Sequence, residues 1–178
     1  MTQEKKIPEI KVIVIYESLY GNTRKIAESL AAGIRKHGIA TMCYSIREVW
    51  NQELASYDLI ALGAPTHYQT SSEPTKEFLK TLESFNLRYK YGFAFDARKD
   101  SFFAGSAAKY IEKEMRKLGL NIIMPYSSGI IYTSSKGEES DKEARRASAH
   151  LREGEEEKFQ KIGENLGELL VINKQQQH

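Results

Sequence analysis

The clearest hydrophobic pattern lies near the start of the chain, where an uninterrupted apolar run is followed by a helical repeat. Val12 to Ile15 are all β-branched, which is typical of a strand buried on both faces of a parallel sheet. From Asn22 onward, apolar residues such as Ile26 and Leu30 recur at the spacing of one helix face. The pattern predicts a strand, a tight polar turn at Ser18 to Thr23, and an amphipathic helix.

Further apolar runs alternate with amphipathic segments along the rest of the chain. Strands are expected at residues 40–45, 59–64 and 89–96, with a fifth strand in two pieces at 121–124 and 129–132. Helices are expected from Pro74, over residues 103–118, and in a long charged terminal segment with a break near Gly154. This alternation predicts a doubly wound α/β sheet with helices on both faces. We expect a single domain over residues 1–178, with an ordered core at about 9–172.

Composition and charge narrow the functional classes. The formal net charge of +2 is too small and too dispersed to indicate a nucleic-acid partner. Cys43 is the only cysteine, which excludes an intrachain disulfide and favours a reducing cytosol. No apolar run reaches membrane-spanning length, and the polar start MTQEKK is unlike a secretory signal. We therefore expect a cytoplasmic protein that neither enters a membrane nor binds nucleic acid.

The polar turn after the first predicted strand has the chemistry of an anion site. A strand that enters a helix through a short loop directs the first helical amides, with the positive end of the helix dipole, into the crevice at the strand's carboxyl end. Ser18, Tyr20, Asn22 and Thr23 add side-chain donors, and Gly21 lets the backbone approach a ligand closely. The Walker and dinucleotide fingerprints are absent. The same residues can also form a plain N-capping turn, and the turn alone leaves both interpretations open.

Residues 16–30, YESLYGNTRKIAESL, resemble the signature of flavodoxins, in which a strand, a Ser/Thr-x-x-Gly-x-Thr loop and a helix hold the phosphate of flavin mononucleotide (FMN). The resemblance implies a flavodoxin-like five-stranded parallel sheet in the order 2-1-3-4-5. It also implies FMN as the cofactor, held at Ser18, Leu19, Tyr20, Gly21, Asn22 and Thr23. Flavodoxins more often have threonine in place of Tyr20, and the tyrosine version resembles flavodoxin modules of flavodiiron proteins and of some quinone reductases.

A second loop, GAPTHYQTSSEP, follows the third predicted strand and resembles the loop that forms one wall of the flavin ring site in flavodoxins. The resemblance implies cofactor contacts from Pro65, Thr66, His67, Tyr68 and Gln69. An aromatic side chain stacked on the ring would contribute about 0.5–1.5 kcal/mol beyond area burial. We favour Tyr68 for this contact, and the sequence leaves His67 open as the alternative.

A third loop is expected after the fourth strand, and its FD-x-R sequence resembles the loop that closes over the flavin in small flavodoxin-domain proteins. Phe95, Asp96 and Arg98 are the candidate cofactor residues here. Asp96 can accept a hydrogen bond from the flavin ring or ribitol, cap the next helix, or pair with Arg98. Phe102 is expected in the core, and Phe103 on the buried face of the helix over residues 103–118.

No catalytic acid or base stands out, and the four histidines, His37, His67, His150 and His178, lack the spacing of metal ligands. The resemblance therefore implies that a bound flavin supplies the redox chemistry. We predict an FMN-binding electron-transfer protein, with a redox partner protein or a small-molecule electron donor or acceptor. The alternatives are a small FMN-dependent NAD(P)H or quinone reductase and a flavodoxin-fold interaction module without flavin. A homo-oligomer is left open.

Two departures from flavodoxins bear on this prediction. In typical flavodoxins a loop glycine lets a peptide flip and donate to N5 of the neutral semiquinone, whereas residues 67–72 contain no glycine. Because positive φ is costlier for other residues, we predict only modest semiquinone stabilisation. Many flavodoxins are also strongly acidic, and the charge of +2 argues against an acidic docking face.

Overall fold

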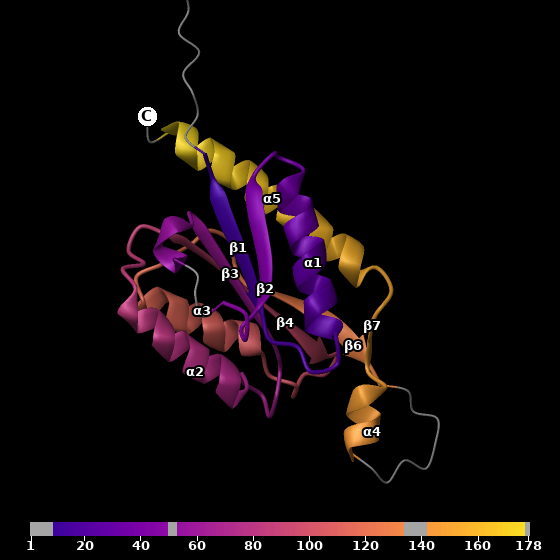
Figure 1. Cartoon of the computed structure of the whole chain (residues 1–178). Helices are drawn as coiled ribbons and strands as arrows, with labels where there is room; N and C mark the ends of the chain where they lie inside the picture. Colours follow the sequence, from indigo (N-terminus) through magenta and orange to yellow (C-terminus); the bar gives the residue numbers. More distant parts are fainter. Residues whose placement is uncertain (1–8, 50–52, 134–141, 177–178) are drawn as a thin grey trace, which may run out of the picture.

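A single sheet forms the centre of the molecule (Figure 1). The computed structural model describes residues 9–49, 53–133 and 142–176. Its strands are β1 (Lys11–Tyr16), β2 (Ala40–Ser45), β3 (Leu59–Pro65), β4 (Tyr91–Lys99), β5 (Asn121–Ile122), β6 (Ser127–Tyr132) and β7 (His150–Leu151). The interior residues of β1 and the first six of β3 are fully buried, as expected for continuous apolar runs between two helical layers.

The strand order is β2-β1-β3-β4-β6-β7, with β5 beside β4. Neighbouring strands are parallel except for β6 and β7, which pair antiparallel through Ile131↔Leu151 and Tyr132↔His150. The predicted order 2-1-3-4-5 is confirmed, with β5 and β6 as the two pieces of the fifth strand. The antiparallel edge strand β7 was not expected from the sequence.

Helices cover both faces of the sheet (Figure 1). They are α1 (Asn22–Arg35), α2 (Glu73–Thr81), α3 (Ala107–Lys117), α4 (Lys142–Ala147) and α5 (Glu155–Gln176), with short 3₁₀ turns η1 (Leu54–Ser56) and η2 (Leu82–Ser84). Because side chains alternate along a strand, Val12 and Val14 join the core under α1 and α5. Ile13 and Ile15 join the core under α2 and α3.

The helices α1 and α5 approach each other closely through glycine. A Cβ atom on Gly33 of α1 would overlap with the carbonyl oxygen of Gln160, and one on Gly163 of α5 would overlap with the carbonyl oxygen of Leu30. Only glycine permits this backbone separation. The contact fixes α1 against the sheet, and with it the turn at the start of α1.

Two sequence-based boundaries around the third loop are wrong. The fourth strand extends to Lys99, because Arg98 and Lys99 pair with Ile130 and Ile131 of β6. The following helix begins at Ala107, after a Ser106 cap that accepts a hydrogen bond from the Lys109 N–H.

Phe102 and Phe103 therefore lie in the loop before α3. They are 95% and 77% exposed, so Phe102 is not a core residue and Phe103 is not on a buried helix face. Within the described residues, the terminal segment forms α4, β7 and α5 instead of one broken helix. The predicted break near Gly154 is confirmed by its φ of 85° immediately before α5.

Candidate functional site

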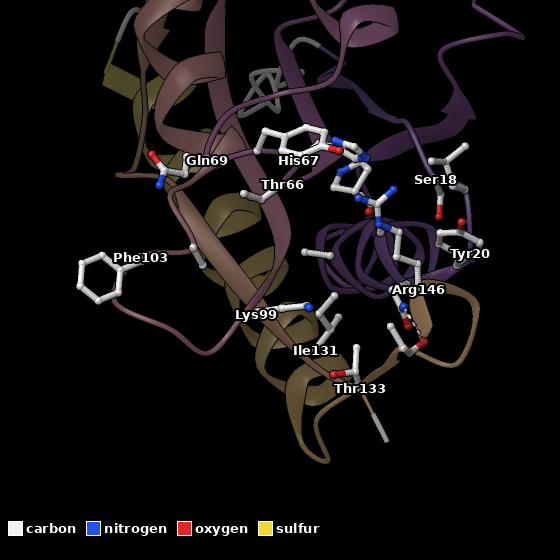
Figure 2. A pocket seen from close by; sticks show the side chains of 18 residues that line it. Ser18, Tyr20, Thr66, His67, Gln69, Lys99, Phe103, Ile131, Thr133 and Arg146 are labelled. Atoms are coloured by element: carbon white, nitrogen blue, oxygen red, sulfur yellow. Dashed lines mark hydrogen bonds between the residues drawn. The ribbon is translucent and has the colours of Figure 1, made fainter. Parts of the chain in front are cut away.

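A cavity of about 340 Å³ opens at the carboxyl ends of the parallel strands (Figure 2). This is the edge where doubly wound proteins bind ligands. Ten of the residues proposed from the sequence line it: Ser18, Leu19, Tyr20, Asn22, Thr23, Pro65, Thr66, His67, Tyr68 and Gln69. Sequence reasoning missed the rest of the lining, which is Ala97, Lys99, Phe103, Ala104, Ile131, Thr133, Arg146 and Ala149.

The turn between β1 and α1 has unused hydrogen-bonding capacity. Gly21 caps α1 in the left-handed region at φ 85°, and the first intrahelical hydrogen bond runs from the Lys25 N–H to the Gly21 carbonyl. The amides of residues 22–24 precede this bond and lie at the positive end of the helix dipole. The Ser18 hydroxyl oxygen is buried without a hydrogen-bond partner. A bound anion would supply the missing acceptor.

The Asn22 side chain is engaged with the protein itself. Its Nδ2 donates to the carbonyl oxygen of Ala149 over 2.8 Å, which links the turn to the segment between α4 and β7. Asn22 therefore lines the cavity and also links the start of α1 to the segment before β7. Nothing in the local sequence indicated this contact, because its two partners come from distant parts of the chain.

A two-residue turn forms another wall of the cavity. The His67 N–H donates to the Thr70 carbonyl over 2.8 Å, and the Thr70 N–H returns a bond to the His67 carbonyl over 3.0 Å. Between them, Tyr68 and Gln69 have φ values of 45° and 69°. The turn thus adopts positive φ without glycine, so the missing glycine alone does not decide how this loop responds to reduction.

The two candidate aromatic residues of this turn contact each other. The rings of His67 and Tyr68 lie 4.6 Å apart between centroids at an interplanar angle of 65°. Because the rings are strongly inclined, they cannot both lie flat against one planar ligand in this arrangement. Tyr68 is 78% exposed, while His67 is partly buried.

Phe95, Asp96 and Arg98 do not lie on a loop and are not among the residues that line the cavity. Phe95 is fully buried and packs near Phe93 and Phe159, with ring centroids 6.4 and 6.1 Å away. The prediction that Phe95 lies on a loop facing the flavin is wrong, because alternation along β4 directs its ring into the core.

Asp96 and Arg98 lie outside the cavity lining and make hydrogen bonds to residues around it. Asp96 is fully buried, and its Oδ2 accepts hydrogen bonds from the Thr66 hydroxyl, the Ser106 hydroxyl and the Ala108 N–H. Of the three roles considered for Asp96, the structure shows the helix cap. The Arg98 guanidinium donates to the Gly105 carbonyl over 2.7 Å. Both side chains hold the loop before α3 in place.

Glu17 is a buried carboxylate that sequence reasoning missed. It directly follows β1, and its Oε2 accepts hydrogen bonds from the Ser72 and Thr75 hydroxyls. Ser72 is also the N-cap of α2. Glu17 therefore fastens the end of β1 to the start of α2, so that the two cavity walls on either side are held together.

The described residues contain neither a cluster of metal ligands nor a helix able to span a membrane. Within residues 9–49, 53–133 and 142–176, no group of three or more His, Cys, Asp or Glu side chains could hold a metal ion. Among the described helices, none combines the length and apolar character that a bilayer crossing needs. The cavity instead joins an anion-binding turn to aromatic and cationic side chains.

The comparison that decides the family is a match to the model of Flavodoxin over residues 14–151. This chain belongs to the flavodoxin family. A flavodoxin from Clostridium saccharobutylicum is 25% identical over 128 residues, covering 71% of this chain and 79% of that protein. Members of the family bind FMN and transfer electrons to redox partners.

Solved structures agree with this assignment. A flavodoxin from the domain Archaea superimposes with a TM-score of 0.70 at 25% identity, covering 92% of this chain and 99% of that one. The flavodiiron protein of Giardia intestinalis has a TM-score of 0.68 at 19% identity, and the match covers 93% of this chain but 37% of that protein. The second likeness shows the fold alone.

The residues present suit FMN. The unpartnered Ser18 hydroxyl and the free amides at the start of α1 are donors of the kind that a phosphate group needs. The volume of about 340 Å³ falls within the roughly 300–1,000 Å³ of small-molecule sites. The remaining lining combines apolar and aromatic side chains, which suit a flavin ring, with polar side chains and the cations Lys99 and Arg146.

Proposed function

We propose that this flavodoxin-family chain is an FMN-binding electron carrier. The observation that carries the proposal is the buried Ser18 hydroxyl, which has no partner and belongs to a turn that lines the cavity and leads into α1. An unsatisfied buried polar atom normally costs about 1–3 kcal/mol, so a ligand acceptor explains its presence. FMN would supply the electron-accepting ring, and the protein would hold and orient it.

In this proposal the cavity residues divide into two groups. Ser18, Leu19, Tyr20, Asn22 and Thr23 would surround the phosphate together with the backbone of Gly21 in the same turn, while Pro65, Thr66, His67, Tyr68 and Gln69 would flank the ring. Tyr68 is the preferred stacking residue, because its ring is largely exposed where His67 is partly buried. Asp96 and Glu17 would position the walls through the hydrogen bonds described above.

The structure of the turn that flanks the proposed ring site supports only modest stabilisation of the one-electron-reduced flavin. A flip of the His67–Tyr68 or the Gln69–Thr70 peptide would break a hydrogen bond between His67 and Thr70, and the bridge between Gln69 and Gly105 restrains the central Tyr68–Gln69 peptide. These restraints on the turn are a structural reason for the modest semiquinone stabilisation predicted from the sequence. They replace the argument from the missing glycine.

A small NAD(P)H-dependent reductase is the second candidate, supported by two cationic side chains, Lys99 and Arg146, in the cavity lining. Anaerobic incubation of the FMN-loaded protein with NADH or NADPH separates the two functions. A carrier leaves the flavin absorbance unchanged until dithionite is added, whereas a reductase bleaches it at catalytic rates. Failure of the purified protein to bind added FMN would leave only an interaction module.

We also infer the chemistry of the redox partner. Leu19, Tyr68 and Phe103 line the cavity and are 57%, 78% and 77% exposed, and Phe102, next to Phe103 in the chain, is 95% exposed. Lys99 and Arg146 add positive charge to the same opening. An apolar rim with basic residues suits a partner protein whose docking face is apolar and acidic.

A further inference from the structure

An arm formed by α4 and β7 lies against the cavity. β7 pairs with β6 through Ile131↔Leu151, and the Arg152 N–H donates to the Ile130 carbonyl over 2.8 Å. Immediately before β7, the Ala149 carbonyl accepts the hydrogen bond from Asn22. These contacts fix residues 149–152, which directly follow α4, relative to both the sheet edge and the turn before α1.

The arm directs one guanidinium group into the cavity (Figure 2). The Arg146 Cζ atom lies 5.9 Å from the centroid of the Tyr68 ring, on the wall that flanks the proposed ring site. Within the described residues, Arg146 makes no ion pair with a carboxylate, whereas Arg152 pairs with Glu155 and Asp100. The neighbouring Arg145 is exposed and does not line the cavity.

We propose that Arg146 raises the reduction potential of the bound flavin by holding its positive charge beside the ring. The inference rests on the proposed FMN-binding function. When the flavin takes up two electrons and one proton, it gains one negative charge, and a nearby cation stabilises that form more than the neutral oxidised form.

Two negative charges near the cavity oppose reduction of the flavin, and Arg146 is placed to offset them. Asp96 and Glu17 are buried carboxylates behind the walls, and Oδ1 of Asp96 has no partner. Their negative charges disfavour adding a further negative charge. Lys99 also lines the cavity but is exposed, so water screens it more strongly. Arg146 is partly buried and held against Tyr68, which makes it the cation best placed to offset the two carboxylates.

A phosphate-binding role for Arg146 is the main alternative. The anion-binding turn already offers the Ser18 hydroxyl and the first amides of α1, all neutral donors. The guanidinium lies over the Tyr68 ring in the ring-flanking turn. This placement favours the ring over the phosphate.

The test compares FMN-loaded Arg146→Gln, Arg146→Lys and the matched control Arg145→Gln. Dissociation constants for oxidised and dithionite-reduced FMN give the potential of the bound couple. We expect Arg146→Gln to weaken binding of reduced FMN about tenfold more than that of oxidised FMN, which lowers a two-electron potential by about 30 mV. Arg146→Lys should retain most of the wild-type potential, and Arg145→Gln should match the wild type.

Each opposing result has a distinct meaning. Equal weakening of oxidised and reduced FMN by Arg146→Gln, with riboflavin binding unchanged, would assign Arg146 to the phosphate and overturn the proposal. An unchanged potential in Arg146→Gln, with FMN still bound, would also overturn it while leaving the electron-carrier function intact. Absence of FMN binding in the wild type would instead reject the proposed function itself.

Discussion

The Thr66 hydroxyl donates a hydrogen bond to Oδ2 of Asp96 over 2.9 Å, which joins the ring-flanking loop to the interior of β4. The same oxygen caps α3 through the Ala108 N–H. We expect Asp96→Asn to lower the free energy of unfolding by about 1–3 kcal/mol, because three donors lose a charged acceptor at a fully buried position. Urea unfolding of the FMN-free protein measures this change.

Asp100→Asn is the matched control for that substitution. Asp100 is 59% exposed and pairs with Arg152 at 3.7 Å, so its replacement should change the free energy of unfolding by less than about 0.5 kcal/mol. Equal changes in the free energy of unfolding for the two substitutions would show that the hydrogen bonds to Asp96 do not stabilise the cavity walls.

Gly105→Ala is expected to disturb the ring-flanking turn. Gly105 has a φ of 67°, and a Cβ atom there would overlap with the backbone of Gln69. Gly38 has a φ of 70° with no atom near the Cβ position, so Gly38→Ala carries only the conformational cost of about 1–2 kcal/mol. Gly105→Ala should lose at least about 1 kcal/mol more in urea unfolding, and also weaken FMN binding. The same loss in both variants would contradict the close contact.

Ser18→Ala should have opposite effects on stability and on binding. Removing a buried hydroxyl without a partner should raise the stability of the FMN-free protein by up to about 1 kcal/mol. FMN affinity should fall about 10- to 100-fold, as expected for a lost hydrogen bond to a charged group, while riboflavin affinity should not change. Fluorescence titration measures both affinities.

Ser71→Ala provides the comparison for Ser18→Ala. The Ser71 hydroxyl is also buried without a partner, but Ser71 does not line the cavity. It should show the same stability gain with unchanged FMN affinity. Unaltered FMN affinity in Ser18→Ala itself would remove the main support for the phosphate site.

Cys43 should be unreactive in the folded protein. Burial raises the pKa of its thiol from 9.0 to about 11, so the reactive thiolate fraction at pH 8 falls about a hundredfold. Iodoacetamide should therefore alkylate the native protein far more slowly than the urea-unfolded protein. Because the unfolded thiol ionises first as pH rises, Cys43 contributes stability below pH 9 that is lost toward pH 11. The Cys43→Ser variant should therefore lose less folding stability than the wild type between pH 9 and pH 11.

The positive cavity opening predicts a salt effect on electron transfer. Ferricyanide should oxidise the reduced FMN-loaded protein more slowly as ionic strength increases, because salt screens its attraction to Lys99 and Arg146. Lys99→Gln should weaken this dependence. Lys109→Gln, which changes an exposed side chain of α3 outside the cavity lining, should leave it unchanged. A rate that rises with salt would indicate an acidic opening.

The sequence was most informative where the structure depends on neighbours along the chain. The unit of β1, its turn and α1 was predictable because a buried strand, Gly21 and a helical repeat follow each other directly. The same local reasoning failed for Phe103, whose spacing fits the helix after it. The better signal was Ser106, a preferred N-cap residue, which marks the true start of α3.

Other features of the site depend on distant contacts. Arg146 lies in a charged segment without a distinctive pattern, and it reaches the cavity only because β7 pairs with β6 and Asn22 binds Ala149. Asp96 was identified as important, but its role as a cap could be assigned only once Thr66 and Ala108 were seen beside it.

The glycine contact between α1 and α5 also sets an order of events during synthesis. The anion-binding turn leaves the ribosome early, but α1 receives its close-packed cover at Gly33 only when Gly163 has been made. A nascent chain without α5 therefore exposes the part of α1 around Leu30 and Gly33 that α5 covers, and leaves the turn without its final support. Tight capture of a phosphate-bearing cofactor then becomes a late step of biogenesis, after α5 has docked.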